Sequence, residues 1–163
     1  MKKIINKVVF GKGFGITLLM VAAVLLTAGF ACETGGDKVP PDNELQSLVK
    51  ETTADFANAI DTGDFSKLHS KASSDFQASY TVNQAKAAFQ TFIDKKDVVL
   101  PSLKDAAGTT PAFSPAPSIR SEKGLNILVA NGEFPSKPFP VKFEYEYVWR
   151  DGGWKMLKLV INM

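Results

Sequence analysis

One histidine, His69, has a side chain suited to proton transfer near neutral pH. An imidazole inside a pocket acts as a general base when it lies within hydrogen-bond reach of a substrate. The neighbouring residues Ser66, Lys67, Ser70 and Lys71 are polar, which favours a solvent-exposed or helix-capping histidine instead. Both interpretations stay open, and we assign no catalytic residue.

The carboxylates and metal-ligating residue types form no convergent set. One histidine and one cysteine are too few for a zinc or copper site, so we predict no metal and no cofactor. Capping and solvation explain four aspartates on predicted helices: Asp55, Asp61, Asp64 and Asp75. Glu144 and Glu146 alternate with aromatic residues along a predicted strand, so we expect them to face solvent or cross-strand lysines.

The only cysteine, Cys32, follows a segment typical of an export signal. Lysines at positions 2, 3, 7 and 12 precede an apolar run from Phe14 to Ala31. A lone thiol in an oxidising compartment has no internal partner, so lipid attachment explains Cys32 better than a disulfide does. We therefore predict that residues 1–31 are a signal peptide and that Cys32 is lipidated, which anchors the protein to a membrane of the cell envelope.

Two alternatives for the N-terminal segment stay open. Gly29 and Ala31 fit the small-x-small pattern of ordinary signal cleavage, which would release a secreted protein. Residues 14–31 also approach the length of a membrane-spanning helix, which would leave an uncleaved anchor. Residues 32–43 are polar and contain glycine and proline, which predicts a tether, and residues 44–163 have the length of one domain.

The charge of the chain argues against a nucleic-acid partner. Four of the 19 lysines and arginines precede Cys32 and none of the 17 acidic residues does, so the rest carries 15 basic against 17 acidic side chains. Nucleic-acid binding requires clustered positive charge, which a slightly acidic domain does not offer.

Three helices are predicted in the first half of the domain. Apolar residues recur at helical spacing at Leu45, Leu48, Val49, Phe56 and Ile60. Thr62 and Gly63 end that helix, and Asp64 is placed to cap a short second one. Thr81 and Gln84 match a capping box that opens a third helix, whose apolar stripe contains Val82, Ala85, Phe89, Phe92 and Ile93.

The second half of the domain has the pattern of an antiparallel sheet. Residues 98–100 predict a short strand, and residues 111–117, with three prolines, predict a loop or a sheet edge. Residues 125–130 are apolar on both faces, and residues 142–149 alternate between aromatic and mostly charged side chains. A turn at residues 151–153 leads into a last strand at 154–161. The predicted class is α+β, with N-terminal helices packed on a strongly curved sheet.

The alternating strand carries an aromatic ladder, which consists of Phe143, Tyr145, Tyr147 and Trp149. Aromatic stripes usually pack in cores, and we expect this one to pack on the third helix through Phe89 and Phe92. The same six side chains are our candidate pocket-lining residues, because a tyrosine hydroxyl near a pocket mouth needs a polar partner.

The order of elements and two short motifs resemble the nuclear transport factor 2-like superfamily, also described as a cystatin-like cone. The motifs are Asp61-Thr62-Gly63-Asp64-Phe65 after the first helix and Gly152-Gly153-Trp154-Lys155-Met156, of the form Gly-x-Trp-Lys-apolar, in the last strand. The resemblance runs from Glu44 to the C-terminus. Residues 89–94, followed by a Pro-rich segment and residues 137–141, resemble an uncharacterised bacterial branch of that superfamily. It implies a bent sheet around helices with a pocket at the mouth of the cone, and it implies no particular activity.

Two classes of function follow. The first is a membrane-tethered, non-enzymatic envelope module that binds a small apolar ligand, a protein partner or a second copy of itself as a homodimer. The second is a small-molecule isomerase, dehydratase or hydrolase that works in the cone. We favour the first class, because the sequence offers no convergent catalytic set.

Overall fold

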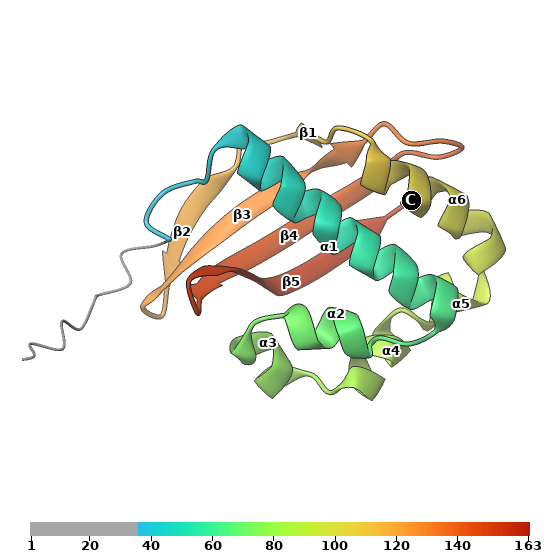
Figure 1. The fold of residues 1–163 in the computed structure, drawn as a ribbon, viewed down its shortest axis with the longest axis horizontal. Coiled ribbons are helices and arrows are strands. Elements are labelled where there is room, and N and C mark those ends of the chain that lie inside the picture. The colour runs from blue at the N-terminus through green and yellow to red at the C-terminus, as the bar shows by residue number, and fades with distance from the viewer. Residues whose placement is uncertain (1–35) are drawn as a thin grey trace, which may run out of the picture. The chain divides into compact units, whose positions relative to one another are not determined.

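The structure of the protein is a computed structural model that describes residues 36–163. The described part is an α+β fold in which helices precede an antiparallel sheet (Figure 1). The helices are α1 (Asp42–Thr62), α2 (Ser66–Lys71), α3 (Ser74–Ser79), α4 (Val82–Ala88), α5 (Gln90–Asp94) and α6 (Lys96–Gly108). The strands are β1 (Ala112–Phe113), β2 (Ser118–Glu122), β3 (Leu125–Phe134), β4 (Val141–Arg150) and β5 (Gly153–Asn162).

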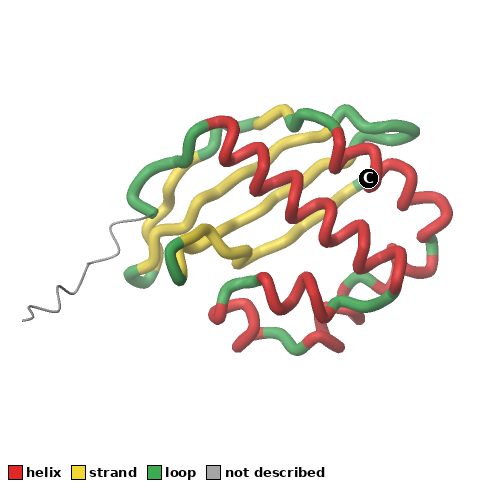
Figure 2. Tube along the Cα trace, viewed as in Figure 1, coloured by secondary structure: helices red, strands yellow, loops and turns green. Residues whose placement is uncertain are grey.

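The long helix α1 forms as its apolar spacing predicts. Its first turn carries Asp42 and Glu44, whose charges suit the positive end of the helix dipole. Gly63 adopts the left-handed conformation, with φ 71°, and its N–H donates to the carbonyl of Ala59, which ends the helix. Figures 1 and 2 show α1 lying across one face of the sheet.

The sheet is built around a central antiparallel pair, β3 and β4. Strand β5 lies on the other side of β4, and β1 and β2 both pair with β3. The hairpin of β4 and β5 is confirmed, with Asp151 and Gly152 at positive φ as a two-residue turn requires. On the face away from α1, Glu144 and Glu146 pair with Lys158, and Glu146 also pairs with Arg120, as expected for a polar sheet face.

The predicted third helix is divided into two short helices. The capping box is confirmed: the Gln84 N–H donates to the Thr81 hydroxyl, and the Thr81 N–H donates to the Gln84 side chain. The helical path changes at Phe89, which closes α4 and precedes α5.

The prediction of a strand at residues 98–100 is wrong, because these residues belong to α6. Pro101 lies inside this helix and removes one N–H, which leaves the carbonyl of Asp97 without its usual donor. Asp97 and Pro101 are exposed, so this helix end faces solvent rather than the core. Leu103 and Ala106 are fully buried and hold α6 against α1. Tertiary burial therefore outweighs the local cost of the proline.

The chain before α1 packs on the domain from Gly36 onward. Gly36 and Pro40 are buried, and the Asp37 carboxylate accepts a hydrogen bond of 2.8 Å from the Asn126 side chain. The carbonyl of Pro41 accepts from the N–H of Leu45, which continues the contact into the first turn of α1. Residues 32–43 are expected to be a tether, and the structure shows that residues 36–41 of this segment pack on the domain.

Candidate functional site

The aromatic ladder packs against α1 rather than against the Phe-rich helices. Phe143, Tyr145 and Tyr147 are fully or almost fully buried on the face of β4 that α1 covers. Phe89 and Phe92 instead surround Phe56 of α1, at ring-centroid distances of 4.8 and 5.7 Å. Phe89 and Phe92 thus pack against the same hydrophobic core as the ladder, but their ring contacts are with Phe56 rather than with the ladder, whose hydroxyls bind α1 instead of the helix expected.

The last member of the ladder, Trp149, lies at the end of the strand in a pair with Trp154. The two indole rings meet edge to face, with centroids 5.5 Å apart. Both side chains are half-buried, and the indole Nε1 of Trp149 is buried without a hydrogen-bond partner among residues 36–163.

A pocket of about 200 Å³ lies between α1, α2 and the start of β5. Among the predicted pocket residues only Tyr147 lines it. Its apolar lining comes from Leu48, Leu68, Ala72, Trp154 and Met156, and its polar lining comes from Glu51, Thr52, Asp55, Lys71, Tyr147 and Lys155. The lining is therefore amphipathic, which is typical of sites that bind small organic molecules.

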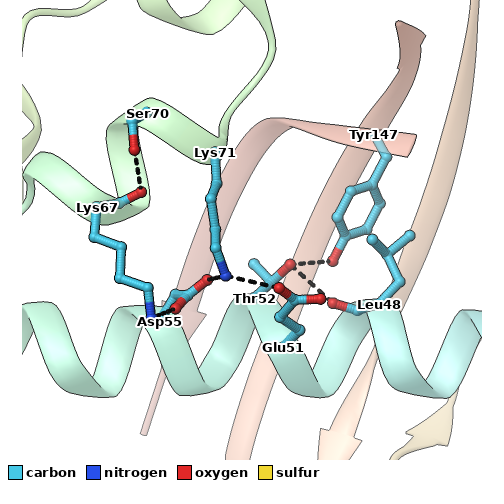
Figure 3. A network of polar contacts seen from close by, with 8 residues as sticks. All are labelled: Leu48, Glu51, Thr52, Asp55, Lys67, Ser70, Lys71 and Tyr147. Carbon is cyan, nitrogen blue, oxygen red and sulfur yellow. Dashed lines mark hydrogen bonds and ion pairs between the residues drawn. The ribbon is translucent and has the colours of Figure 1, made fainter. Parts of the chain in front are cut away.

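Two consecutive threonines of α1 hold the two tyrosine hydroxyls. The hydroxyl of Tyr147 donates to Thr52 Oγ1 at 2.9 Å, and Thr52 donates in turn to the carbonyl of Leu48 (Figure 3). Tyr145 and Thr53 share the same arrangement, also at 2.9 Å, and Thr53 donates to the carbonyl of Val49. Every hydroxyl is satisfied, so both tyrosines are fixed in place.

An ion-pair network forms the wall of the pocket beside α2. Asp55 is only 7% exposed, and its two carboxylate oxygens lie 2.9 Å from Lys67 Nζ and 2.6 Å from Lys71 Nζ. Lys71 Nζ also lies 2.7 Å from a carboxylate oxygen of Glu51 (Figure 3). The expectation that solvation explains Asp55 is wrong, because the residue is buried and paired with both lysines of α2.

The pKa values of three groups that line the pocket, Asp55, Lys71 and Tyr147, are shifted further away from pH 7. Burial acts to raise the pKa of the Asp55 carboxyl, but the hydrogen bonds and charges of Lys71 and Lys67 outweigh it, so the net pKa is lowered. Hydrogen bonds to Asp55 and Glu51 raise the pKa of Lys71. Burial raises the pKa of Tyr147 well above its usual value. These three groups keep fixed protonation states at pH 7, which suits recognition better than proton transfer.

His69 does not line the pocket. Its Nε2 lies 2.6 Å from the carbonyl oxygen of Tyr80, and its ring meets Phe76 edge to face. The histidine therefore connects α2 to the segment after α3. Cys32, the predicted lipidation site, lies outside the described residues.

Residues 36–163 contain no group of three potential metal ligands and no helix long and apolar enough to cross a membrane.

The predictions from the aromatic ladder did not identify Thr52 and Thr53 as partners of the tyrosine hydroxyls, although the sequence contains a signal for them. Thr52 and Thr53 continue the apolar stripe of α1, although both carry a hydroxyl. A buried hydroxyl needs a partner, and the tyrosines of the ladder are the available complements. No comparable signal points to Asp55, because its burial depends on where α2 packs.

Comparisons with known proteins identify no relative. No family model matches the chain, and neither a curated protein nor a solved structure does.

Proposed function

We propose that this protein is an envelope lipoprotein, anchored through Cys32, whose domain binds a small ligand or a protein partner without catalysing a reaction. The basic head, the apolar run and the single cysteine support the anchor. The α+β order of elements and the register shift in the hairpin at Glu146 and Tyr147 support a nuclear transport factor 2-like cone over residues 44–163.

The observation that carries the binding function is the pocket beside Tyr147, together with its fixed charges. An apolar cavity of about 150 Å³ holds one benzene ring, so a pocket of 200 Å³ suits a single small ring or a short chain. Leu48, Trp154 and Met156 offer contacts to an apolar body. The Asp55 and Lys71 pair supplies fixed charges to a polar substituent, and neither group changes protonation near neutral pH.

A binding titration tests this proposal with indole, which has a flat apolar body and one hydrogen-bond donor. The protein of residues 32–163, which is one compact unit, carries Cys32→Ser to remove the anchor. We expect indole to shift the NMR signal of the Met156 methyl group in a saturable way. Ala72→Leu, which fills the pocket, weakens the titration at least about tenfold, a loss of about 1.4 kcal/mol.

The matched control is Ala88→Leu, which makes the same change on the exposed surface of α4 and leaves the titration unchanged. An unsaturable shift, or equal binding by both variants, would remove the pocket from the proposal. The anchor has a separate test in the intact mass of the membrane fraction. We expect a chain that begins at Cys32 and carries added acyl mass, and we expect Cys32→Ser to abolish that species.

A further inference from the structure

The segment from Gly36 to Pro41, which we call the strap, is fixed to one end of the sheet. Gly36 has φ 97°, and a Cβ added there would lie 2.6 Å from Cβ of Trp149, so only glycine permits this approach. Asp37 binds the side chain of Asn126 at the start of β3, and Pro41 joins α1. The strap therefore has a defined path over Trp149.

The strap begins very close to Cys32 along the chain. Only residues 33–35 lie between Cys32 and Gly36. A fully extended chain spans at most about 3.5 Å per residue, so Gly36 lies no more than roughly 14 Å from the Cα atom of Cys32. A tether of that reach cannot lift the domain away from the surface to which Cys32 is attached.

We propose that the end of the domain formed by the strap, Trp149 and Trp154 is a membrane-facing surface that rests on the lipid bilayer. This inference rests on the proposed function, because it takes Cys32 as the lipid-bearing residue. The occupant of this surface is the headgroup layer of the same membrane that holds the anchor.

The chemistry of this end suits a headgroup layer. A groove there is lined by the strap, Glu44 and the two tryptophans, and the strap residue Val39 is 38% exposed. Indole rings concentrate at membrane interfaces, because they combine an apolar body with a polar N–H.

Charge contributes little to the orientation. Basic residues at this end are mixed with acidic ones: Lys38, Lys123 and Arg150 lie near Asp37, Glu44 and Asp151, and Arg150 pairs with Asp75. Mixed charges give weak net attraction to anionic lipids, so the orientation depends on the short connection and the tryptophans. We expect it to be insensitive to salt.

The tryptophans provide the measurement, because the sequence has only two and both lie at this end. The full chain, processed and acylated, is placed in phosphatidylcholine vesicles that contain lipid with a spin-labelled headgroup. We expect the label to quench the tryptophan fluorescence strongly.

A matched variant moves the reporter to the opposite end of the sheet. It carries Trp149→Phe, Trp154→Phe and Phe139→Trp, and position 139 is exposed in the loop before β4. A strand of 10 residues spans about 33 Å, so this reporter lies far from the lipid surface. We expect quenching to fall at least fivefold, to the level of free tryptophan in solution.

A second variant leaves every described residue unchanged. Insertion of about twelve Gly and Ser residues between Glu33 and Thr34 adds a flexible reach of roughly 20 Å, which allows the domain to leave the surface. We expect quenching of the native tryptophans to decrease at least twofold. This arm decides the question even if the triple variant does not fold.

Three results would overturn the inference. Equal quenching of the reporters at both ends, or no effect of the insertion, in a chain whose mass shows acylation, would refute the surface and leave the proposed anchor intact. A chain whose mass shows no acyl group would refute the anchor and, with it, the surface.

Discussion

The interface between α1 and the sheet has two halves. Each contains a hydrogen-bonded tyrosine–threonine pair, but only one of them opens into a pocket. In the first half, Tyr145 binds Thr53 in the closed core, and α6 packs on α1 and β4 with Leu103 and Ala106 buried in the same core. In the second half, Tyr147 binds Thr52, and the neighbouring helix α2 leaves a pocket. The two tyrosine–threonine pairs have the same geometry, so they do not decide which half is open.

The difference comes from the helix that covers each half. Helix α6 has 13 residues and buries Ser102, Leu103 and Ala106. Helix α2 has six residues, buries only Leu68, and is held to α1 by ion pairs of Lys67 and Lys71 with Asp55. Ion pairs hold two helices without filling the space between them. A short, charged covering helix therefore leaves room for a ligand where a longer apolar helix does not.

Removal of each tyrosine ring tests this comparison and has the largest expected effect. Tyr145→Ala leaves a cavity in a closed core, which costs about 3–5 kcal/mol of unfolding free energy. Tyr147→Ala enlarges a pocket that already admits solvent, so we expect a loss about 1 kcal/mol smaller. Urea unfolding of residues 32–163 with Cys32→Ser measures both. Equal losses would mean that the two halves are equally closed.

The ion pairs of the open half predict a dependence on acid pH. The pKa of Asp55 is lowered from its ordinary value of 3.8, so its stabilising contribution is complete above that value. The contribution is lost as the pH falls below 3.8 through the lower folded pKa. Asp55→Asn removes this part of the acid dependence and costs about 1–2 kcal/mol at pH 7, as expected for a buried carboxylate with two hydrogen-bonded lysines.

The control for this prediction is Asp61→Asn. Asp61 pairs with Lys104 of α6, whose hydrogen bond also lowers the pKa of Asp61, but both side chains reach solvent, so water replaces the lost partner and the effect on stability is smaller. Unfolding curves between pH 3 and pH 7 should therefore differ for the two variants. An Asp55→Asn protein with the acid dependence of the unmodified chain would contradict the network.

Removal of the hydroxyl alone is a smaller and sharper test. Tyr145→Phe deletes a hydrogen bond to Thr53, which is 0% exposed, and costs about 1 kcal/mol. Tyr147→Phe deletes the equivalent bond to Thr52, which is 8% exposed and lines the pocket, so water can replace the donor. We expect that loss to stay below about 0.5 kcal/mol. The reverse order would place the solvent-accessible half at Tyr145.

Local patterns predicted the parts of the fold that depend on neighbouring residues. The hairpin, the capping box at Thr81 and the glycine end of α1 all follow from turn and cap chemistry within a few residues. The face of the ladder also followed from its alternation along β4.

Tertiary packing decided the parts that the sequence could not predict. Residues 98–100 are helical because α6 packs on α1, although their β-branched residues and Pro101 favour a strand locally. Asp55 is buried because α2 brings two lysines to it, and the strap is ordered because Gly36 fits against Trp149. Each depends on residues distant in sequence, which no local pattern relates.

The smallest expected effect belongs to His69. It tests whether a contact of α2 outside the pocket affects ligand binding in the pocket. His69 bonds the carbonyl of Tyr80 on a partly exposed surface and does not contact the pocket. His69→Ala removes one hydrogen bond and one edge-to-face ring contact with Phe76, so we expect a loss of about 0.5–1 kcal/mol and unchanged indole binding. Urea unfolding and the Met156 methyl titration, run on the same sample, give both values. Weakened indole binding by a fully folded variant would mean that His69 acts through α2 on the pocket, and that the ion pairs alone do not position this helix.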